Sequence, residues 1–528
     1  MVAVLTASPT RFKVRPHCGT TSSRRYERRR PEKTPLYKIV SEHLEGWLEN
    51  RAVAEHPVSA HIERELRSYL TCGILCFGFG RARCTSCGQG FVVAFSCKGR
   101  GVCPSCNGRR MAQTAAHLVD RVIPPVPVRQ WVISVPKRLR CFLADRPSAV
   151  AALTRIFIEE IERLLCTAAG STRDGHRPSV ARPRLGAVSF LHRFGSAINH
   201  HVHLHACATD GVFVPTGDGP PAFLPARLIT QADLATLTEK VRRRVVRWFR
   251  MQRLLDADVA ADMLRWENSG FSVDASVRIT LIDRDVPSYF QSLEHLLRYC
   301  ARPPFALERL SVIRGADGRI ARVRYVLPRH KAANWVGRGR GRTSTRPGAN
   351  GVVELSTFEF LDRLADLVPP PRKHRHRYHG VFAPNHRLRK AVTALAIGNV
   401  SKQREATTGG DGNDGRATGG CCDTKPDQKP RSHDTSRIAW AKLLARVGEE
   451  FPLECPACGG DIRLIAFITE PGSIRKILTH LGEPLEPPPI AAARGPPTDW
   501  YELVEAQDDR DVFQASSDEL PAIDIHSL

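Results

Sequence analysis

The amino-acid sequence predicts an α+β protein built from several domains. The chain has 528 residues, too many for one ordinary core, so about two to four domains are expected. Segments 185–194 and 198–214 alternate as strands do and follow each other as an antiparallel pair. Segments 147–167 and 231–255 have helical periodicity and lie on either side of these strands in the sequence. Helices packed on an antiparallel sheet are typical of the α+β class.

Charge is the most unusual property of the composition. The 78 Lys and Arg residues exceed the 54 Asp and Glu residues, which gives a formal net charge of +24. Such a surplus indicates a polyanionic partner, most commonly nucleic acid, although a GC-rich genome that favours Arg would supply part of it. No run approaches the roughly 20 apolar residues of a membrane helix, and no secretory signal is recognisable. We therefore expect a cytoplasmic protein without membrane contact.

The N-terminal part divides into two predicted regions. Residues 1–34 are rich in Arg, Ser and Thr, and we expect a disordered basic arm. A transit peptide, or a reading frame that starts too far upstream, would have the same composition. Residues 35–118 are expected to form a helical and zinc-binding domain, because apolar residues recur at helical spacing from Tyr37 to Trp47 and a group of cysteines follows.

Seven cysteines lie within residues 72–106. In a reducing compartment, metal binding is expected rather than a disulfide framework. Two Cys-x-x-Cys pairs separated by fifteen residues fit the four-thiolate zinc pattern, in which two knuckles complete a tetrahedron. The ligands of this predicted site are Cys84, Cys87, Cys103 and Cys106. Cys97 and Cys72 could replace one of them or bind a second ion. Four thiolates leave no position for water, so we expect a structural ion.

The segment 198–214 places three histidines on one face of a predicted strand. With a period of two, His201, His203 and His205 point to one side and the apolar residues between them to the other. Neighbours on one face lie about 6.6 Å apart, so two imidazoles can hold one ion, whereas His201 and His205 lie roughly 13 Å apart. His203 and His205 are therefore the predicted metal pair, and a strand face without any ion is the alternative.

A helix expected after Asp285 offers a candidate nucleophile. A metal site in a basic protein suggests phosphodiester chemistry, in which the ion polarises the phosphate and either water or a side chain attacks. At about 100° per residue, His295, Tyr299 and Arg302 fall together beside the apolar stripe of this helix. With arginines nearby to bind phosphate, Tyr299 is preferred to Tyr378 as the nucleophile; an ordinary core or surface aromatic is the alternative.

Beyond residue 395 the chain changes character. Residues 396–437 are expected to be a disordered linker, residues 438–490 a small module and residues 491–528 an acidic tail. The small module contains Cys455 and Cys458, a single zinc knuckle whose partner is not evident from the sequence.

Several motifs occur together in one order along the chain. They are Phe95-Ser96-Cys97-Lys98, Cys103-Pro104-Ser105-Cys106, Val128-Arg129-Gln130-Trp131-Val132, His203-Leu204-His205 with Asp210-Gly211-Val212, Leu297-Arg298-Tyr299-Cys300-Ala301-Arg302-Pro303-Pro304, and Arg377-Tyr378-His379-Gly380-Val381-Phe382-Ala383-Pro384-Asn385. On these motifs the chain resembles rolling-circle transposases of the IS-ninety-one insertion-sequence family, part of the HUH endonuclease superfamily. The resemblance covers residues 32–395, and the Cys455 knuckle is similar to the tail of the family.

The resemblance implies an endonuclease domain over residues 119–395, with an antiparallel sheet, flanking helices and the histidines on a central strand. It implies that Tyr299 nicks single-stranded DNA at an element end, leaving a 5′-phosphotyrosine and a free 3′-OH, before strand transfer. His203 and His205 would hold Mg²⁺ or Mn²⁺, and the N-terminal domain structural Zn²⁺. Some relatives have a second tyrosine where this chain has His295. We therefore expect a single-tyrosine enzyme in which His295 is a metal ligand or accepts the phenol proton.

The resemblance also implies DNA as the partner, in a bacterial cytoplasm close to the nucleoid. A second subunit could complete strand transfer, so a homodimer is an expectation. The cations expected to contact DNA are Arg109, Arg110, Arg243, Arg247, Arg298, Arg377 and Arg387, although those on the predicted helix 231–255 could equally form a solvated face. A plasmid or phage replication initiator or relaxase would use the same chemistry. A non-catalytic zinc-containing DNA-binding protein is the alternative from another class.

Overall fold

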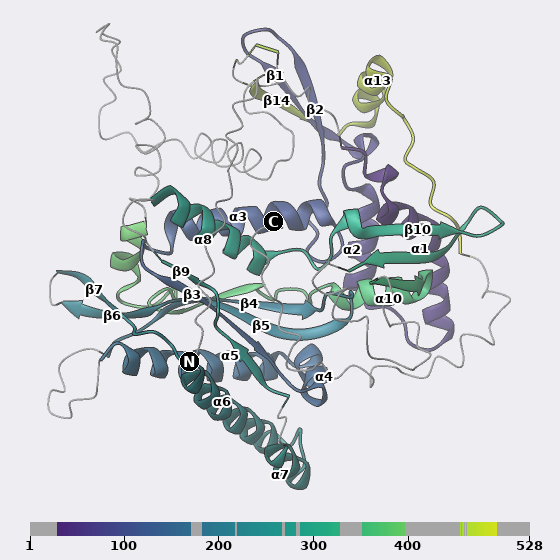
Figure 1. Cartoon of the computed structure of the whole chain (residues 1–528). Helices are drawn as coiled ribbons and strands as arrows, with labels where there is room; N and C mark the ends of the chain where they lie inside the picture. Colours follow the sequence, from purple (N-terminus) through teal and green to yellow (C-terminus); the bar gives the residue numbers. More distant parts are fainter. Residues whose placement is uncertain are drawn as a thin grey trace, which may run out of the picture.

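The computed structural model describes residues 29–170, 182–216, 219–266, 270–280, 286–327, 351–396, 455, 457–458, 460 and 462–493 (Figure 1). A six-stranded antiparallel sheet lies at its centre. Its strands follow the order β13 (His376–Gly380), β4 (Gly186–Phe194), β5 (His200–Thr209), β3 (Val128–Ser134) and β8 (Ser272–Asp274), and β9 (Arg278–Ile279) also pairs with β3. The predicted strand pair is thus β4 and β5, and the sheet with its helices confirms the α+β class.

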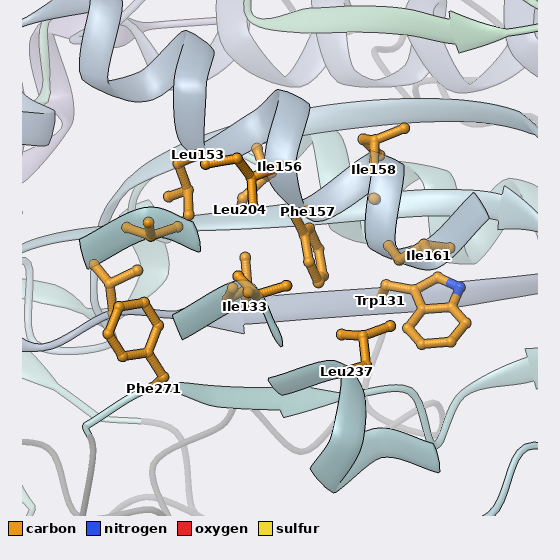
Figure 2. Close-up of a cluster of buried hydrophobic side chains, with 14 of the residues drawn as sticks. Trp131, Ile133, Leu153, Ile156, Phe157, Ile158, Ile161, Leu204, Leu237 and Phe271 are labelled. Atoms are coloured by element: carbon orange, nitrogen blue, oxygen red, sulfur yellow. The ribbon is translucent and has the colours of Figure 1, made fainter. Parts of the chain in front are cut away.

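Helices cover both faces of this central sheet. On one face, α5 (Pro147–Ala168) and α6 (Gln231–Met251) pack over a core that includes Trp131 and Leu204 (Figure 2). On the other face, α3 (Pro104–Arg121) and α8 (Val286–Ala301) pack against Phe190 and Cys207. Because side chains alternate along β5, its odd-numbered residues, which include His203 and His205, face α8. The helices α4 (Lys137–Asp145) and α7 (Ala257–Arg265) contribute to the same core as α5 and α6.

The N-terminal helices share a core with a second, three-stranded sheet. The indole of Trp47 is buried in this core and donates its N–H to Asp362 at 2.9 Å. The elements of this unit are α1 (Pro35–Val53), α2 (Ala60–Thr71), β10 (Leu310–Arg314), β11 (Ile320–Val326), β12 (Val352–Ser356), α10 (Thr357–Leu367) and the short helices η1 (Pro31–Lys33) and η3 (Leu307–Arg309). The predicted boundary at residue 118 falls inside α3, which continues to Arg121 and links this unit to the central sheet.

A third sheet joins distant parts of the sequence. The hairpin of β1 (Phe79–Cys84) and β2 (Gly90–Ala94) receives β14 (Ile462–Ile468) along the free side of β1. The following helix α13 (Pro471–Leu481) packs on the short helix η2 (Leu75–Phe77) through Ile474 and Leu478. The described part of the predicted 438–490 module therefore packs against the N-terminal part of the chain.

A buried carboxylate holds the corner after the histidine strand, where β6 (Gly211–Thr216) pairs with β7 (Gly219–Pro225). Asp210 is fully buried and accepts hydrogen bonds from Arg129 at 2.8 and 3.0 Å, while Arg278 forms a second ion pair with it. A Cβ atom on Gly211 would lie 2.2 Å from the carbonyl oxygen of Leu224, so only glycine fits there. The Asp-Gly-Val motif therefore shapes the corner of the sheet.

Several predicted regions lie outside the described residues. They are the basic arm up to residue 28, the linker from residue 397 and the acidic tail from residue 494. Among the helices that the structure describes, none combines the length and the apolar surface that a membrane crossing requires.

Candidate metal centre and nucleophile

Three histidines meet on the face of the central sheet that α8 covers. His203 and His205 lie on β5, and His192 lies on β4 directly opposite His203. The ring centroids are 5.1 Å apart for His192 and His203, 4.3 Å for His192 and His205, and 5.0 Å for His203 and His205. All three side chains are buried, and one nitrogen of each lies within 4.8 Å of the others. The sequence pattern missed His192, which comes from the neighbouring strand.

Hydrogen bonds to the backbone determine which nitrogen of two rings is available. His192 donates its Nε2–H to the carbonyl oxygen of Cys300 at 2.6 Å. His203 donates its Nδ1–H to the carbonyl oxygen of His201 at 3.1 Å. Nδ1 of His192 and Nε2 of His203 therefore keep the lone pairs that a metal ion would need.

Gln130 on β3 orients the third ring. The Nε2 atom of its amide lies 2.8 Å from Nδ1 of His205, and the buried Oε1 has no hydrogen-bond partner among the described residues. Exchanging the two amide atoms by a half-turn about the last side-chain bond presents the oxygen to Nδ1–H and leaves Nε2 of His205 with a lone pair. Nε2 of His205 and Nδ1 of His192 are buried without a hydrogen-bond partner among the described residues. Buried polar atoms without partners are costly, and one ion between the rings would satisfy both. The three imidazoles therefore fit a divalent ion.

Burial keeps these imidazoles in the form that binds metals. Removal from water lowers the pKa of His192 and His205 well below the usual range and lowers the pKa of His203 to about 4. The positive charge of Arg302 acts in the same direction on all three rings. Neutral imidazole is the coordinating form, so the cluster is ready to bind an ion at neutral pH.

Tyr299 of α8 lies against the histidine cluster. Its ring centroid is 5.7 Å from that of His205, and its side chain is only 6% exposed. The phenol oxygen is buried without a hydrogen-bond partner among the described residues. The guanidinium of Arg302 lies over the phenol ring, with Cζ 4.5 Å from the centroid. Burial raises the pKa of Tyr299, and Arg302 opposes that rise. A phenol, a cation and a metal-binding group thus share one site.

His295 and Tyr378 lie away from this site. His295 is exposed, and His192 takes the place in the cluster that we expected for it. This corrects the expected role of His295: four residues turn a helix about 40° beyond a full turn, which carries its side chain toward solvent. Tyr378 pairs in register with Val188, which lies four residues, or about 13 Å, from His192 along β4.

The arginines expected to contact DNA are distributed over several surfaces. Arg298 lies next to Tyr299 in sequence and pairs with Glu294 at 2.8 Å. Arg243 pairs with Glu239 on α6, on the sheet face opposite to the histidines. The others are Arg109 and Arg110 on α3, Arg247 on α6, Arg377 on β13, and Arg387 shortly after β13.

Eight cysteines form two separate clusters of four, which share no member. The first contains Cys72, Cys97, Cys103 and Cys106, and the second contains Cys84, Cys87, Cys455 and Cys458. This corrects the expectation that the two N-terminal Cys-x-x-Cys pairs share one ion. Each of those pairs instead meets two cysteines from elsewhere in the chain.

The β1–β2 hairpin explains why the predicted set is divided. The N–H of Gly73 donates to the carbonyl oxygen of Phe95 at 2.9 Å, which closes the base of the hairpin. Cys72 and Cys97 flank this base, close to the start of α3 and its two cysteines. Cys84 lies at the other end of β1, about 17 Å further along the strand.

The first cysteine cluster has the geometry of a tetrahedral zinc site. The Sγ atom of Cys72 lies 3.6 Å from that of Cys103 and 3.8 Å from that of Cys106, and Cys97 lies 3.6 Å from Cys106. With Zn–S bonds of about 2.3 Å, the edge of an ideal tetrahedron is about 3.8 Å. Four thiolates close the coordination sphere, which suits a structural ion.

A carboxylate that sequence reasoning missed holds the loop of this first cluster. Glu65 of α2 accepts the backbone N–H groups of Arg100 at 2.8 Å, of Gly101, and of Val102 at 2.9 Å. These three residues lie between the second and third cysteines of the cluster. Nothing in the sequence pattern marks this Glu, because the contact depends on how α2 packs against the loop.

Glu65→Ala is expected to lower the zinc affinity of the first cluster by about 10- to 100-fold, because three loop N–H groups lose their acceptor. Competition with a chromogenic chelator measures the affinity. The matched control is Glu63→Ala on the same helix, since Glu63 pairs with the exposed Arg67 at 2.8 Å. Equal zinc affinity in the two variants would show that Glu65 does not support the site.

Two family models match the chain. Residues 39–135 match the model described as "Transposase zinc-binding domain", which contains the first cysteine cluster. Residues 186–390 match the model described as "Putative transposase", which contains the three histidines and Tyr299.

The chain is also similar to a curated protein, and no solved structure matches it. The relative is named "Putative transposase y4qJ", from Sinorhizobium fredii, and is 23% identical over 367 residues. The match covers 68% of this chain and 82% of the relative. The chain therefore contains a transposase zinc-binding domain of the IS-ninety-one type followed by a domain of the putative-transposase type, and these two domains carry the first cysteine cluster and the histidine site.

Proposed function

We propose that the chain is a rolling-circle transposase of the HUH endonuclease type, which nicks single-stranded DNA at the ends of a mobile element. The observation that best supports this proposal is the burial of the Tyr299 phenol against three histidines on adjacent strands. A nucleophile beside a metal-binding cluster is a combination that can cleave a phosphodiester, because the ion can polarise the phosphate that the phenol attacks. The net charge of +24 supports DNA as the substrate.

The proposed cleavage is a transesterification at Tyr299. The phenol loses its proton, and its oxygen forms a bond with the scissile phosphorus. The bond from phosphorus to the 3′ oxygen breaks, and that oxygen leaves as a hydroxyl after it takes up a proton. The 5′ end stays attached as a phosphotyrosine, so the link can be passed to another 3′-OH during strand transfer.

The residues His192, His203 and His205 would hold the catalytic divalent ion. When bound, the ion polarises the phosphate and stabilises the charge that develops on it. Three imidazoles without a carboxylate favour Mn²⁺, because Mg²⁺ prefers oxygen ligands; the greater cellular supply of Mg²⁺ keeps both ions in the proposal.

Arg302 is the cation best placed for the phosphate of the substrate. Its guanidinium lies over the ring of Tyr299 and, at 5.6 Å, over the ring of Phe194. Its Nε is buried without a hydrogen-bond partner in the described part of the chain. Stacking on two rings orients the guanidinium while its donors remain available to phosphate oxygens.

The proposal also includes the binding partner of the chain and its location in the cell. The partner is single-stranded DNA, and the reaction takes place in a bacterial cytoplasm close to the nucleoid. One tyrosine makes one phosphotyrosine at a time. Joining two strands therefore needs a second subunit in a homodimer or a second use of Tyr299.

The test offers the full chain an oligonucleotide with the single-stranded terminal sequence of the element, together with Mn²⁺. We expect a covalent protein–DNA adduct that survives a denaturing gel and that disappears when EDTA removes the ion. Binding without any adduct would favour the non-catalytic DNA-binding alternative. An adduct with a plasmid origin but none with the element end would favour a replication initiator or relaxase.

A further inference from the structure

The second cysteine cluster connects segments that are far apart in sequence. The Sγ atom of Cys84 lies 3.5 Å from that of Cys458, and the Sγ atom of Cys87 lies 3.5 Å from that of Cys455. The members of these pairs are 374 and 368 positions apart. The family model for the zinc-binding domain ends at residue 135, so it includes the first two cysteines and not the last two.

The two halves of this cluster share an equivalent backbone hydrogen bond. The N–H of Cys84 donates to the carbonyl oxygen of Gln89 at 2.8 Å, and the N–H of Cys455 donates to that of Gly460 at 2.8 Å. Both hydrogen bonds span five residues and close a turn around a Cys-x-x-Cys pair. A Cβ atom on Gly460 would lie 2.2 Å from Oγ of Ser86, so the two turns touch. Paired knuckles of this kind are typical of four-thiolate zinc sites.

Few buried apolar side chains surround the second cluster. β14 pairs with β1 from Phe79 opposite Ile468 to Cys84 opposite Ile462, which brings the C-terminal strand up to the knuckles. The buried hydrophobic residues at this end of the sheet are Ala82, Cys84, Phe91 and Cys455. The other end of this sheet packs against Ile474 and Leu478 of α13, but so small a core gives the cysteine end little support, and a metal ion can supply a further link there.

We propose that Cys84, Cys87, Cys455 and Cys458 bind a second zinc ion, which fastens residues 455–493 to the N-terminal domain. The distance of 3.5 Å across each pair is close to the tetrahedron edge of about 3.8 Å that Zn–S bonds require. Four thiolates close the coordination sphere, so the ion is structural and its binding is coupled to the folding of this sheet. This site is independent of the proposed nicking chemistry.

The test counts zinc ions in the purified full-length protein by elemental analysis. The wild type is expected to contain about two ions per chain, and Cys84→Ser/Cys87→Ser and Cys455→Ser/Cys458→Ser about one each. The quadruple Ser variant is also expected to keep about one, because all four side chains serve the same ion. The control Cys141→Ser, on the exposed surface of α4 and outside both clusters, keeps about two.

Three results would overturn the shared site. One is a wild type with about one ion, as disulfides within this cluster would produce. Another is a quadruple variant that loses both ions while each double variant keeps one, because the losses would then add. If a double variant loses both ions, the single variant Cys458→His is measured, because an imidazole can replace a thiolate as a zinc ligand. About two zinc ions per chain in this variant would support the shared site, and about one would overturn it.

Discussion

Tyr299→Phe is expected to form no detectable adduct with single-stranded DNA in the presence of Mn²⁺, a loss of at least about 1000-fold in the rate of adduct formation. The substitution removes the oxygen that would bond to phosphorus and keeps the ring that packs against His205 and Arg302. A denaturing gel with a labelled oligonucleotide measures the rate.

The structure makes this variant a clean probe of chemistry. The phenol oxygen has no hydrogen-bond partner among the described residues, so its removal leaves no donor or acceptor unpaired and costs little stability. The matched control is Tyr378→Phe, whose ring lies on β13 away from the histidines. We expect the control to react at the rate of the wild type. An adduct with Tyr299→Phe, or none with Tyr378→Phe, would show that the nucleophile is another residue.

Local periodicity was sufficient to place three of the four residues of the candidate site, namely two histidines and the tyrosine. Alternation along β5 puts His203 and His205 on one face, and the phase of α8 puts Tyr299 beside its apolar stripe. His192 could not be found in this way. Its place depends on the register between β4 and β5, which sets His192 opposite His203. This register is decided by the packing of whole strands.

The cysteines show a second limit of sequence spacing. The two N-terminal Cys-x-x-Cys pairs have the right separation for one zinc site, yet the hairpin between them holds one pair at its tip and the other near its base. The cysteines that complete each cluster are Cys72 and Cys97 at the base, and Cys455 and Cys458 beyond the linker. A partner more than 360 positions away leaves no trace in local spacing.

Helical periodicity also led to a wrong prediction for His295, and the reason is physical. His295 is one turn from Tyr299, and a helical wheel places the two side by side. A side chain at the margin of an apolar stripe can lie on the covered or the open side, according to how the helix rolls on the sheet. In α8 the roll buries Tyr299 and leaves His295 exposed.

His192→Ala is expected to reduce Mn²⁺-dependent adduct formation by at least about 100-fold, as much as His203→Ala does. Each substitution removes one of three imidazoles and leaves an incomplete set of ligands. The control is His295→Ala, which removes an exposed imidazole from the helix of Tyr299 and should change the rate less than about twofold. Equal rates for His192→Ala and the wild type would exclude His192 from the metal site.

A loss of activity alone would not identify His192 as a ligand, because this side chain also donates a hydrogen bond to the carbonyl oxygen of Cys300, the residue next to Tyr299. If His192 acted only through that bond, its removal would displace Tyr299 and slow the reaction, yet Mn²⁺ would still bind to His203 and His205. If it is a ligand, Mn²⁺ binding itself weakens by at least about tenfold without any DNA present. Titration of the DNA-free protein with Mn²⁺ separates these two roles when the free ion is measured by its electron paramagnetic resonance signal. Weakened Mn²⁺ binding in His192→Ala, with unchanged binding in Tyr299→Phe, would assign the ion to the three histidines and the covalent step to the tyrosine.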